Sequence, residues 1–585
     1  MLVSILLLLS FVLFVLSLLK AATSFTRMIW LPFALFAAIS TMLCVYGLVS
    51  LIGVPFSPIL TVAINFIAAV SIWLYAKRSK PEAGHPRWAT RKDVILLAFI
   101  LLFSACVFAI QFGYPIMPNF ETTDPAIHLS SSIRMYEGGT ITGQYSTHMI
   151  CACFITILSP FLGPDCMLLA FALSETFLLF LSGLMFYSVI AVYCQKLGWI
   201  AGIVLCGFYL LGYPLNNSIF GFSYWGFSVT IICALIFAAR VFPIQRLVTQ
   251  VLFAICLFDL MISYSLFVPV TYIAVFAWMI AKLRKDGIAL VLRALSIVFV
   301  FPVIIGFLVV YLGIFGNSGA SGVSSAINTA GYSFKNLFAL FIPIAPLSIY
   351  GAVINRRQNS FLVLFSALFV LFSIALCVLG MLNYVSAYYF SKVYSVIWLI
   401  LFVFGALGVQ SLKEQNLAML VSYSAVWLLV LFLAVSGMDN KIYDSRREFS
   451  SAPVAWSLYP LYEFNLARLP HDEGDEGLVE LFQQARSYGD AGADYEVIGS
   501  DYMIRWSTPI LDNDDPLLWW TYDEQSVLDD LSSHDYIVMG HGAPESLVTV
   551  DGKGYEEIRA KALGQYEEVF RNDAGGIYKR RTVQE

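Results

Sequence analysis

Apolar runs of membrane-spanning length follow one another through residues 2–437 of this chain. A helix that crosses the hydrocarbon core of a bilayer needs about 20 predominantly apolar residues. The runs predict an all-α polytopic membrane body of about 14 transmembrane helices, two of them short. The predicted helices are 2–19, 28–50, 57–76, 94–113, 165–193, 199–213, 224–243, 248–263, 266–282, 288–315, 336–354, 359–382, 391–410 and 416–437.

The composition excludes a soluble enzyme. Hydrophobic residues make up 59% of the chain and charged residues only 12%, and the mean hydropathy is +0.78. Soluble globular chains carry about 25% charged residues. Half of the usual charge cannot cover the surface of a body of this size.

The charges divide the chain into two parts. Residues 438–585 hold 29 acidic and 13 basic residues, whereas residues 1–437 hold 10 acidic and 21 basic ones. The acidic segment is long enough to bury a core of its own. Its patterns predict strands at 495–498 and 536–539, a helix at 526–531 and a final hairpin from strands 566–570 and 577–579, which together make a small α/β domain.

The basic residues predict the orientation of the membrane body. Cytoplasmic loops carry an excess of Lys and Arg, and 18 of the 21 basic residues before position 438 fall on one side if residues 148–163 do not cross. We therefore interpret 148–163 as a re-entrant or interfacial helix at the outer face. Both termini and the acidic domain are then extracytoplasmic. The three basic residues on the outer side are Arg134, Lys335 and Lys392.

The longest predicted outer loop of the membrane body, residues 114–164, holds the candidate chemistry. Asp124 precedes Pro125, a pairing typical of a helix start, so Asp124 is expected to be an N-cap residue. His128 follows one helical turn later, and Glu121 lies three positions before Asp124. Of the acids in the spans, Asp259 is expected near the outer end of its helix.

The loop and its position resemble the GT-C glycosyltransferases. The segment 123–128, which reads TDPAIH, is similar to the Asp-Pro-x-x-His or Asp-Pro-x-x-Asn start of the corresponding loop in oligosaccharyltransferase-like members. The layout also resembles uncharacterised actinobacterial members, which have extra N-terminal helices, a Gly-x-Pro turn (here residues 53–55) and a closing soluble domain. The resemblance implies a three-helix extension at 1–93, a GT-C-like body at 94–437 and an extracytoplasmic domain at 438–585.

The resemblance implies transfer of a sugar from a polyprenyl-phosphate donor to a cell-envelope glycan or lipid on the outer face, with inversion. Asp124 would be the catalytic base or a metal ligand, assisted by Glu121 and His128. The outer cations would hold the lipid phosphate, because Lys offers it a point charge and Arg binds it bidentately. The candidate substrate- and phosphate-binding residues are Lys335, Lys392, Arg134 and Asp259.

The sequence leaves open the cofactor and two alternative functions. A divalent metal, magnesium or manganese, is a candidate cofactor with Asp124 as ligand, although two threonines separate Glu121 from Asp124 where the commonest family pattern has adjacent acids. No nucleic-acid partner is expected. The rival interpretations are a transporter or flippase of envelope precursors, which favours inverted repeats that the sequence lacks, and a non-catalytic scaffold that binds envelope polymer. Each apolar or charged candidate also has a purely structural interpretation, such as a cap, an ion pair or an interfacial anchor.

Overall fold

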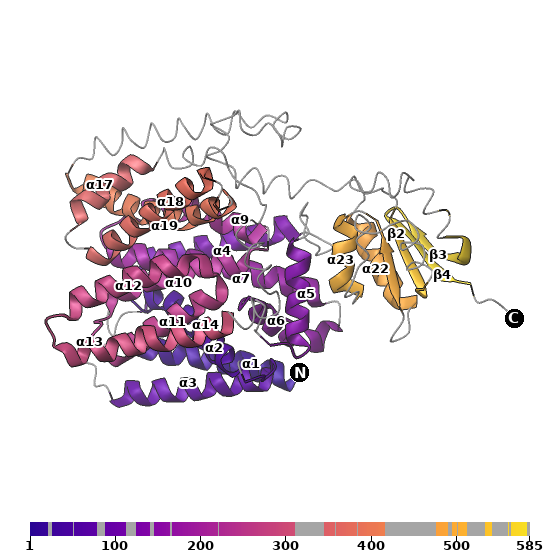
Figure 1. Cartoon of the computed structure of the whole chain (residues 1–585), viewed down its shortest axis with the longest axis horizontal. Helices are drawn as coiled ribbons and strands as arrows, with labels where there is room; N and C mark the ends of the chain where they lie inside the picture. The colour runs from indigo at the N-terminus through magenta and orange to yellow at the C-terminus, as the bar shows by residue number, and fades with distance from the viewer. Residues whose placement is uncertain are drawn as a thin grey trace.

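The structure of the chain is a computed structural model in which long helices form one bundle and a small domain lies against one end of it (Figure 1). The predicted combination of an all-α membrane body and a C-terminal α/β domain is confirmed. The structure describes residues 1–21, 26–50, 52–78, 88–112, 124–140, 145–163, 166–219, 221–310, 344–356, 359–382, 384–385, 387–415, 475–488, 494–499, 501–511, 533–540, 560 and 563–581.

Ten helical segments of the described residues are long and apolar enough to cross a membrane. They are α1 (Leu2–Lys20), α2 (Arg27–Ser50), α3 (Pro58–Arg78), α4 (Arg91–Phe112), α7 (Cys166–Tyr193), α10 (Ser223–Val241), the run of η2 (Ser265–Phe267) and α12 (Val268–Leu283), the run of α13 (Ile288–Leu295), η3 (Ser296–Val300) and α14 (Phe301–Val310), α18 (Ser360–Met381) and α19 (Ala387–Gln415). Three shorter apolar helices are α6 (His148–Leu162), α8 (Trp199–Leu210) and α11 (Leu247–Ser263).

The predicted helix positions agree with these bounds to within a few residues over the described part of the chain. The predicted span 416–437 and the first part of 336–354, where only α17 (Ala345–Asn355) is described, lie outside it. The total of fourteen spans therefore stays a prediction. The chain is nevertheless a multi-pass helical membrane protein, with α7 at the centre of the bundle in contact with α2, α4, α6 and α10.

One end of the bundle holds the last turns of α10, α12 and α19, which carry the basic residues Arg240, Lys282 and Lys413. The backbone N–H of Lys196 donates to Gln410 Oε1 of α19 at 3.2 Å, and Arg293 donates to the carbonyl of Gln245 at 2.8 Å. We call this the basic end, and it also holds the ends of α3, α10 and α12. The helix α5 (Asp124–Tyr136) lies at the opposite end of the bundle (Figure 1), which we call the α5 end.

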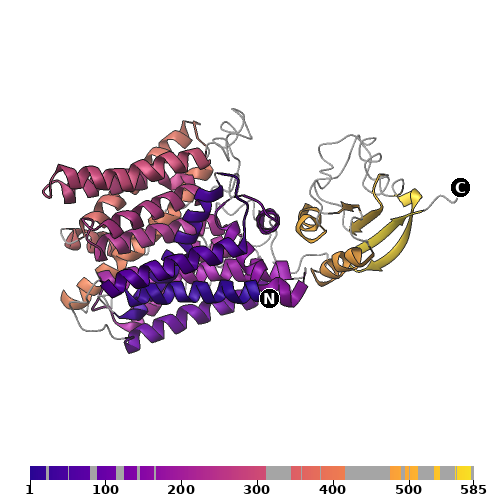
Figure 2. The ribbon, with the colours of Figure 1, turned by 90° about the horizontal axis from the view of Figure 1, so that it is seen from below.

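The helix α6 covers residues 148–162 of the segment that is predicted not to cross. Its 15 residues span about 22 Å at 1.5 Å per residue, which is short of the roughly 30 Å hydrocarbon core. It packs on α5 and α7. The hydroxyl of Ser4, at the start of α1, donates to the carbonyl of Thr156 in α6 at 2.9 Å, so α6 and the N-terminus share the α5 end (Figure 2).

The C-terminal domain contains a four-stranded sheet with the order β1-β2-β4-β3. The strand β1 (Tyr495–Ile498) runs parallel to β2 (Tyr536–Gly540), while β4 (Gly575–Arg580) is antiparallel to both β2 and β3 (Tyr566–Asn572). All four predicted strands are confirmed; the predicted helix at 526–531 lies outside the described residues. The helices α22 (Asp475–Tyr488) and α23 (Asp501–Leu511) complete the described domain.

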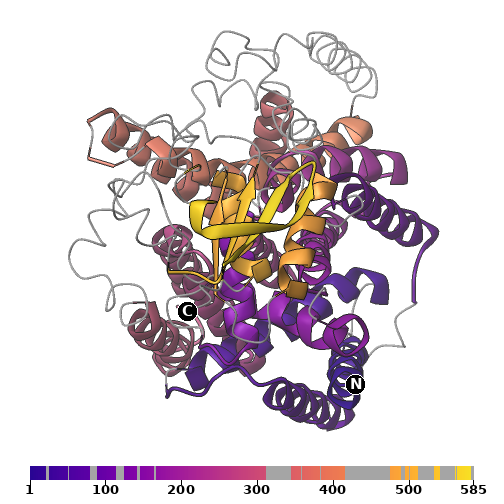
Figure 3. The same ribbon diagram turned by 90° about the vertical axis from the view of Figure 1, so that its right-hand side faces the viewer.

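The domain covers the α5 end of the bundle. Helix α23 contacts α5, and a view along the bundle shows the sheet and its helices in front of the bundle's end (Figure 3). Leu129 of α5, Met167 of α7 and Ile510 of α23 line one small pocket between the two parts. The domain thus lies at the same end as the loop that carries the predicted chemistry.

Candidate functional site

Helix α5 begins at Asp124, where the sequence predicts a helix start. His128 lies one turn further along and is buried, with 8% of its surface exposed. Two other predicted site residues, Glu121 and Lys335, lie outside the described residues. For Asp124, the structure gives its position as the first residue of α5.

His128 and Lys392 meet at the α5 end, although 264 positions separate them in the chain. Phe222, just before α10, lies between them: its ring centroid is 6.3 Å from that of His128 and 4.3 Å from Lys392 Nζ. Lys392 itself is 3% exposed. The positive charge of Lys392 acts on His128, so two of the predicted site residues belong to one cluster.

Aromatic rings enclose this cluster. Lys392 Nζ lies 3.7 Å from the ring centroid of Trp225, and Trp225 Nε1 donates to Ser395 Oγ at 2.8 Å. Tyr224 stacks on Tyr145 at 3.8 Å with an angle of 6° between the rings. Cation–π contact and a hydrogen bond therefore fix the tryptophan against α19, and the stacked tyrosines form a second wall.

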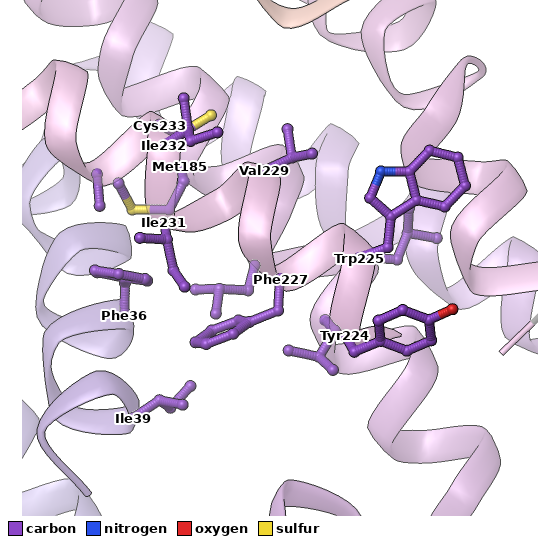
Figure 4. Packing of buried hydrophobic residues seen from close by; sticks show 14 of the residues in the cluster. Phe36, Ile39, Met185, Tyr224, Trp225, Phe227, Val229, Ile231, Ile232 and Cys233 are labelled. Carbon is purple, nitrogen blue, oxygen red and sulfur yellow. The ribbon is translucent and has the colours of Figure 1, made fainter. Parts of the chain in front are cut away.

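The start of α10 contributes Tyr224 and Trp225 to the aromatic enclosure, because the side chains of this helix point in two different directions. Figure 4 shows Tyr224 and Trp225 directed away from Phe36 of α2. One turn further along α10, Phe227 is directed toward Phe36, with the two ring centroids 5.9 Å apart. The apolar face of α10 is thereby buried in the bundle, while its N-terminal aromatic residues reach the α5 end.

Gly221 allows the start of α10 to approach α5. Its φ is +67°, a conformation that glycine adopts without the penalty of a side chain. A Cβ atom at this position would lie 3.1 Å from Phe171 Cζ and 3.2 Å from Pro125 Cα. The close approach places Phe222 next to His128 and Lys392.

His148, the first residue of α6, is a partner of His128 that the sequence did not reveal. His128 Nδ1 lies 3.2 Å from His148 Nε2, and both rings are buried. Burial and then the charge of Lys392 lower the pKa of His128 to about 4. Burial, followed by the effect of His128, lowers the pKa of His148 as well. Both imidazoles are therefore neutral at physiological pH.

The segment before His148 is anchored by hydrogen bonds to α11. Ser146 Oγ lies 2.8 Å from Ser263 Oγ, and the backbone N–H of Ser146 donates to the carbonyl of Ile262 at 3.3 Å.

The sequence alone does not pair His148 with His128, because a separation of twenty residues between two histidines gives no helical or strand periodicity. Only the position of His148 at the start of the predicted re-entrant helix signals its proximity to the loop.

Arg134 and Asp259 have different surroundings from this cluster. Arg134 is an exposed residue in the last turn of α5, two turns beyond His128. Asp259 is fully buried within the bundle, where the hydroxyl of Ser40 in α2 donates to it. The structure thus brings together His128 and Lys392 and places Asp259 in a helix–helix contact.

The described donors of the cluster do not fit the metals that the resemblance admits. Magnesium and manganese prefer oxygen ligands, whereas the described side chains here are two imidazoles beside an ammonium group. Among the described residues, no group of three or more His, Cys, Asp or Glu side chains is arranged to hold a metal ion. No step of the reaction proposed below uses a metal.

No protein-family model matches the sequence, and neither does any curated protein. Among solved structures, the chain resembles the crystal structure of ArnT from Cupriavidus metallidurans bound to undecaprenyl phosphate. The sequences are 11% identical, the match covers 82% of this chain and 97% of that chain, and the TM-score is 0.46. A likeness at this level establishes neither a shared family nor a shared activity.

Proposed function

We propose that this chain is a membrane glycosyltransferase that moves a sugar from a polyprenyl-phosphate donor to a cell-envelope glycan or lipid at the α5 end of the bundle. The observation that carries the proposal is the meeting of His128, on the predicted catalytic loop, with Lys392 inside an aromatic enclosure. The ammonium group suits a phosphate, and aromatic faces suit the apolar face of a sugar ring. Both kinds of group are needed by a lipid-phosphate sugar.

The proposed reaction is a single displacement at the anomeric carbon. The acceptor oxygen forms a bond to that carbon while the bond from carbon to the phosphate oxygen breaks, so the configuration inverts. Asp124 takes the proton from the acceptor hydroxyl as general base. The charge that develops on the departing lipid phosphate is stabilised by Lys392, a contribution of the electrostatic kind that often dominates enzyme catalysis.

The remaining predicted residues have supporting roles in this proposal. Glu121 assists Asp124 at the start of α5, and Lys335 and Arg134 add positive charge for the lipid phosphate at the α5 end. The contact of Asp259 with Ser40 supports a structural role in the bundle, and we propose no contact between Asp259 and the substrate. Of the two roles that the resemblance implies for Asp124, we propose that of catalytic base rather than that of metal ligand.

The test is sugar transfer in reconstituted vesicles supplied with a panel of polyprenyl-phosphate sugars. Because a positioned base contributes about 10²–10⁴-fold, we expect Asp124→Asn to lower the rate by that factor. Lys392→Met removes the phosphate-stabilising charge, and we expect a loss of about 10²-fold. Lys413→Met, at the other end of the same helix, is the matched control and should keep the wild-type rate.

Two outcomes would contradict the proposal. An Asp124→Asn variant that transfers sugar at the wild-type rate removes the proposed base. A protein that moves labelled lipid across the vesicle membrane without transferring sugar, and does so equally well with Asp124→Asn, is a transporter or flippase instead.

A further inference from the structure

The contact between His128 and His148 permits only one proton between the two rings. Their nearest nitrogens, Nδ1 of His128 and Nε2 of His148, are 3.2 Å apart. A neutral imidazole has one nitrogen that donates and one that accepts. One of the two histidines therefore donates across this contact, and the choice fixes the chemistry of the opposite nitrogen of each ring.

The two arrangements give His128 opposite functions. If His128 donates from Nδ1, its Nε2 is a bare acceptor and His148 carries its own proton on Nδ1. If His148 donates from Nε2, His128 carries its proton on Nε2 and offers a donor, while His148 Nδ1 is the bare acceptor. The first arrangement makes His128 a base and the second makes it a neutral hydrogen-bond donor.

The surroundings of His148 favour the second arrangement. Its ring is 5% exposed, and within the described part of the chain its Nδ1 atom is buried without a hydrogen-bond partner. In folded proteins a buried backbone N–H group without a partner is rarer than an under-satisfied backbone carbonyl, and we apply the same order to the donor and acceptor nitrogens of an imidazole. The proton of His148 is therefore better placed on Nε2, where His128 Nδ1 accepts it.

Tyr145 holds the His148 ring in position for this contact. The backbone N–H of His148 donates to the carbonyl of Tyr145 at 3.1 Å, and the two ring centroids are 5.7 Å apart. The ring of Tyr145 lies 5.9 Å from that of His128. One residue thus contacts both imidazoles, so neither ring is oriented by the histidine pair alone.

We propose that His148 is a positioning residue that donates from Nε2 to His128 Nδ1 and so holds His128 as a neutral Nε2–H donor, which binds a phosphate group together with Lys392. The ligand class, a phosphate ester, rests on the proposed function, whereas the direction of the hydrogen bond does not. In this arrangement His128 accepts no proton from the acceptor hydroxyl. Proton removal then belongs to Asp124, assisted by Glu121.

The direction of the hydrogen bond is measurable by solid-state NMR of protein labelled with ¹⁵N-histidine. The chain has six histidines, so the spectrum is sparse, and the signals that disappear in His128→Asn identify the two nitrogens of His128. We expect the Nδ1 of His128 to be unprotonated and its Nε2 to be protonated at neutral pH. A protonated Nδ1 on His128 would overturn the inference, and this measurement needs only the wild-type fold.

Two variants of His148 test its effect on binding, with dodecyl phosphate as the probe. His148→Gln keeps an amide N–H donor, and we expect it to retain the His128 tautomer and most of the affinity. His148→Leu lacks a donor, and we expect about tenfold weaker binding, which corresponds to the loss of one buried hydrogen bond. Unchanged binding and an unchanged His128 tautomer in His148→Leu would refute the positioning role.

The outcomes separate this inference from the proposed function. If the tautomer and the probe affinity behave as expected but no sugar is transferred by the wild-type protein, the glycosyltransferase proposal fails and the inference stands. If sugar transfer depends on Asp124 but His128 is protonated on Nδ1, the proposed function stands and the inference fails.

Discussion

At the scale of single residues, the burial of His128 predicts a dependence of stability on pH. Its pKa is lowered to about 4 in the folded protein by burial and by Lys392, against about 6.5 in an unfolded chain. Between these values the unfolded state binds more protons, so acidification lowers the free energy of unfolding, by about 3 kcal/mol for the full interval. Above pH 6.5 this contribution does not change.

The measurement is thermal unfolding of the purified protein in detergent from pH 7 to pH 4. Replacing His128 by Asn removes the titrating ring, and we expect the melting temperature of this variant to fall less over that range than the wild type does. Ser130→Ala, which alters a residue of the same helix that does not titrate, is the control and should keep the wild-type slope. Equal slopes for His128→Asn and the wild type would contradict the assignment.

The residue scale also shows what the sequence could and could not predict about the site. His128 and Lys392 were both predicted from their position in the topology, because outer cations and a loop helix are visible in the sequence. Their proximity was not predictable, since it depends on the turn at Gly221 and on Phe222, which lies near both side chains. His148 has no periodic relation to His128, and only packing of α6 on α5 brings the rings together.

At the scale of elements, α17 and α19 pack backbone against backbone through glycine. A Cβ atom on Gly408 would lie 2.3 Å from the carbonyl oxygen of Leu347, and one on Gly351 would lie 2.1 Å from that of Phe404. Ser348 Oγ, on the same face of α17, donates to the carbonyl of Leu401 at 2.6 Å. Close contacts of this kind are typical of membrane helices that associate through small residues.

We expect Gly408→Leu to separate these two helices and to lower the free energy of unfolding by about 1–3 kcal/mol or more, the usual cost of overpacking. Retention of folded protein in detergent on heating, followed by size-exclusion chromatography, measures the effect. Gly198→Ala is the matched control, because a Cβ there meets only Lys413 Nζ at 3.9 Å. Equal stability of the two variants would show that the helices can move apart without cost.

The helices and strands were the features best predicted from the sequence. Each spanning helix corresponds to a long apolar run, and each strand of the domain corresponds to a short run with β-branched or aromatic residues. Helix α6 was predicted not to cross from charge parity alone, and this stays a prediction, because α8, which lies in a predicted span, is shorter still. The π-helical turn of η3 within the run from α13 to α14 has no counterpart in the apolar pattern, since hydropathy does not report local helix winding.

At the scale of the whole molecule, the C-terminal domain and helix α5 occupy the same end of the bundle. Helix α23 contacts α5, whereas α19 has its last turn, with Lys413 and Gln410, at the basic end. The positive-inside rule assigns the basic end to the cytoplasm. We therefore predict that the domain and the α5 end both lie on the extracytoplasmic side.

This orientation predicts that protease added to the outside of intact cells or spheroplasts removes residues 438–585, whereas protease added to the outside of inverted vesicles leaves this segment and the α5 end uncut. An epitope inserted in the basic segment 79–87 should show the reverse accessibility and serves as the internal control. Protection of the domain from outside, with exposure of the 79–87 epitope, would invert the topology. It would also place Lys392 and His128 on the cytoplasmic face, where a sugar donor presented at the outer face cannot reach them.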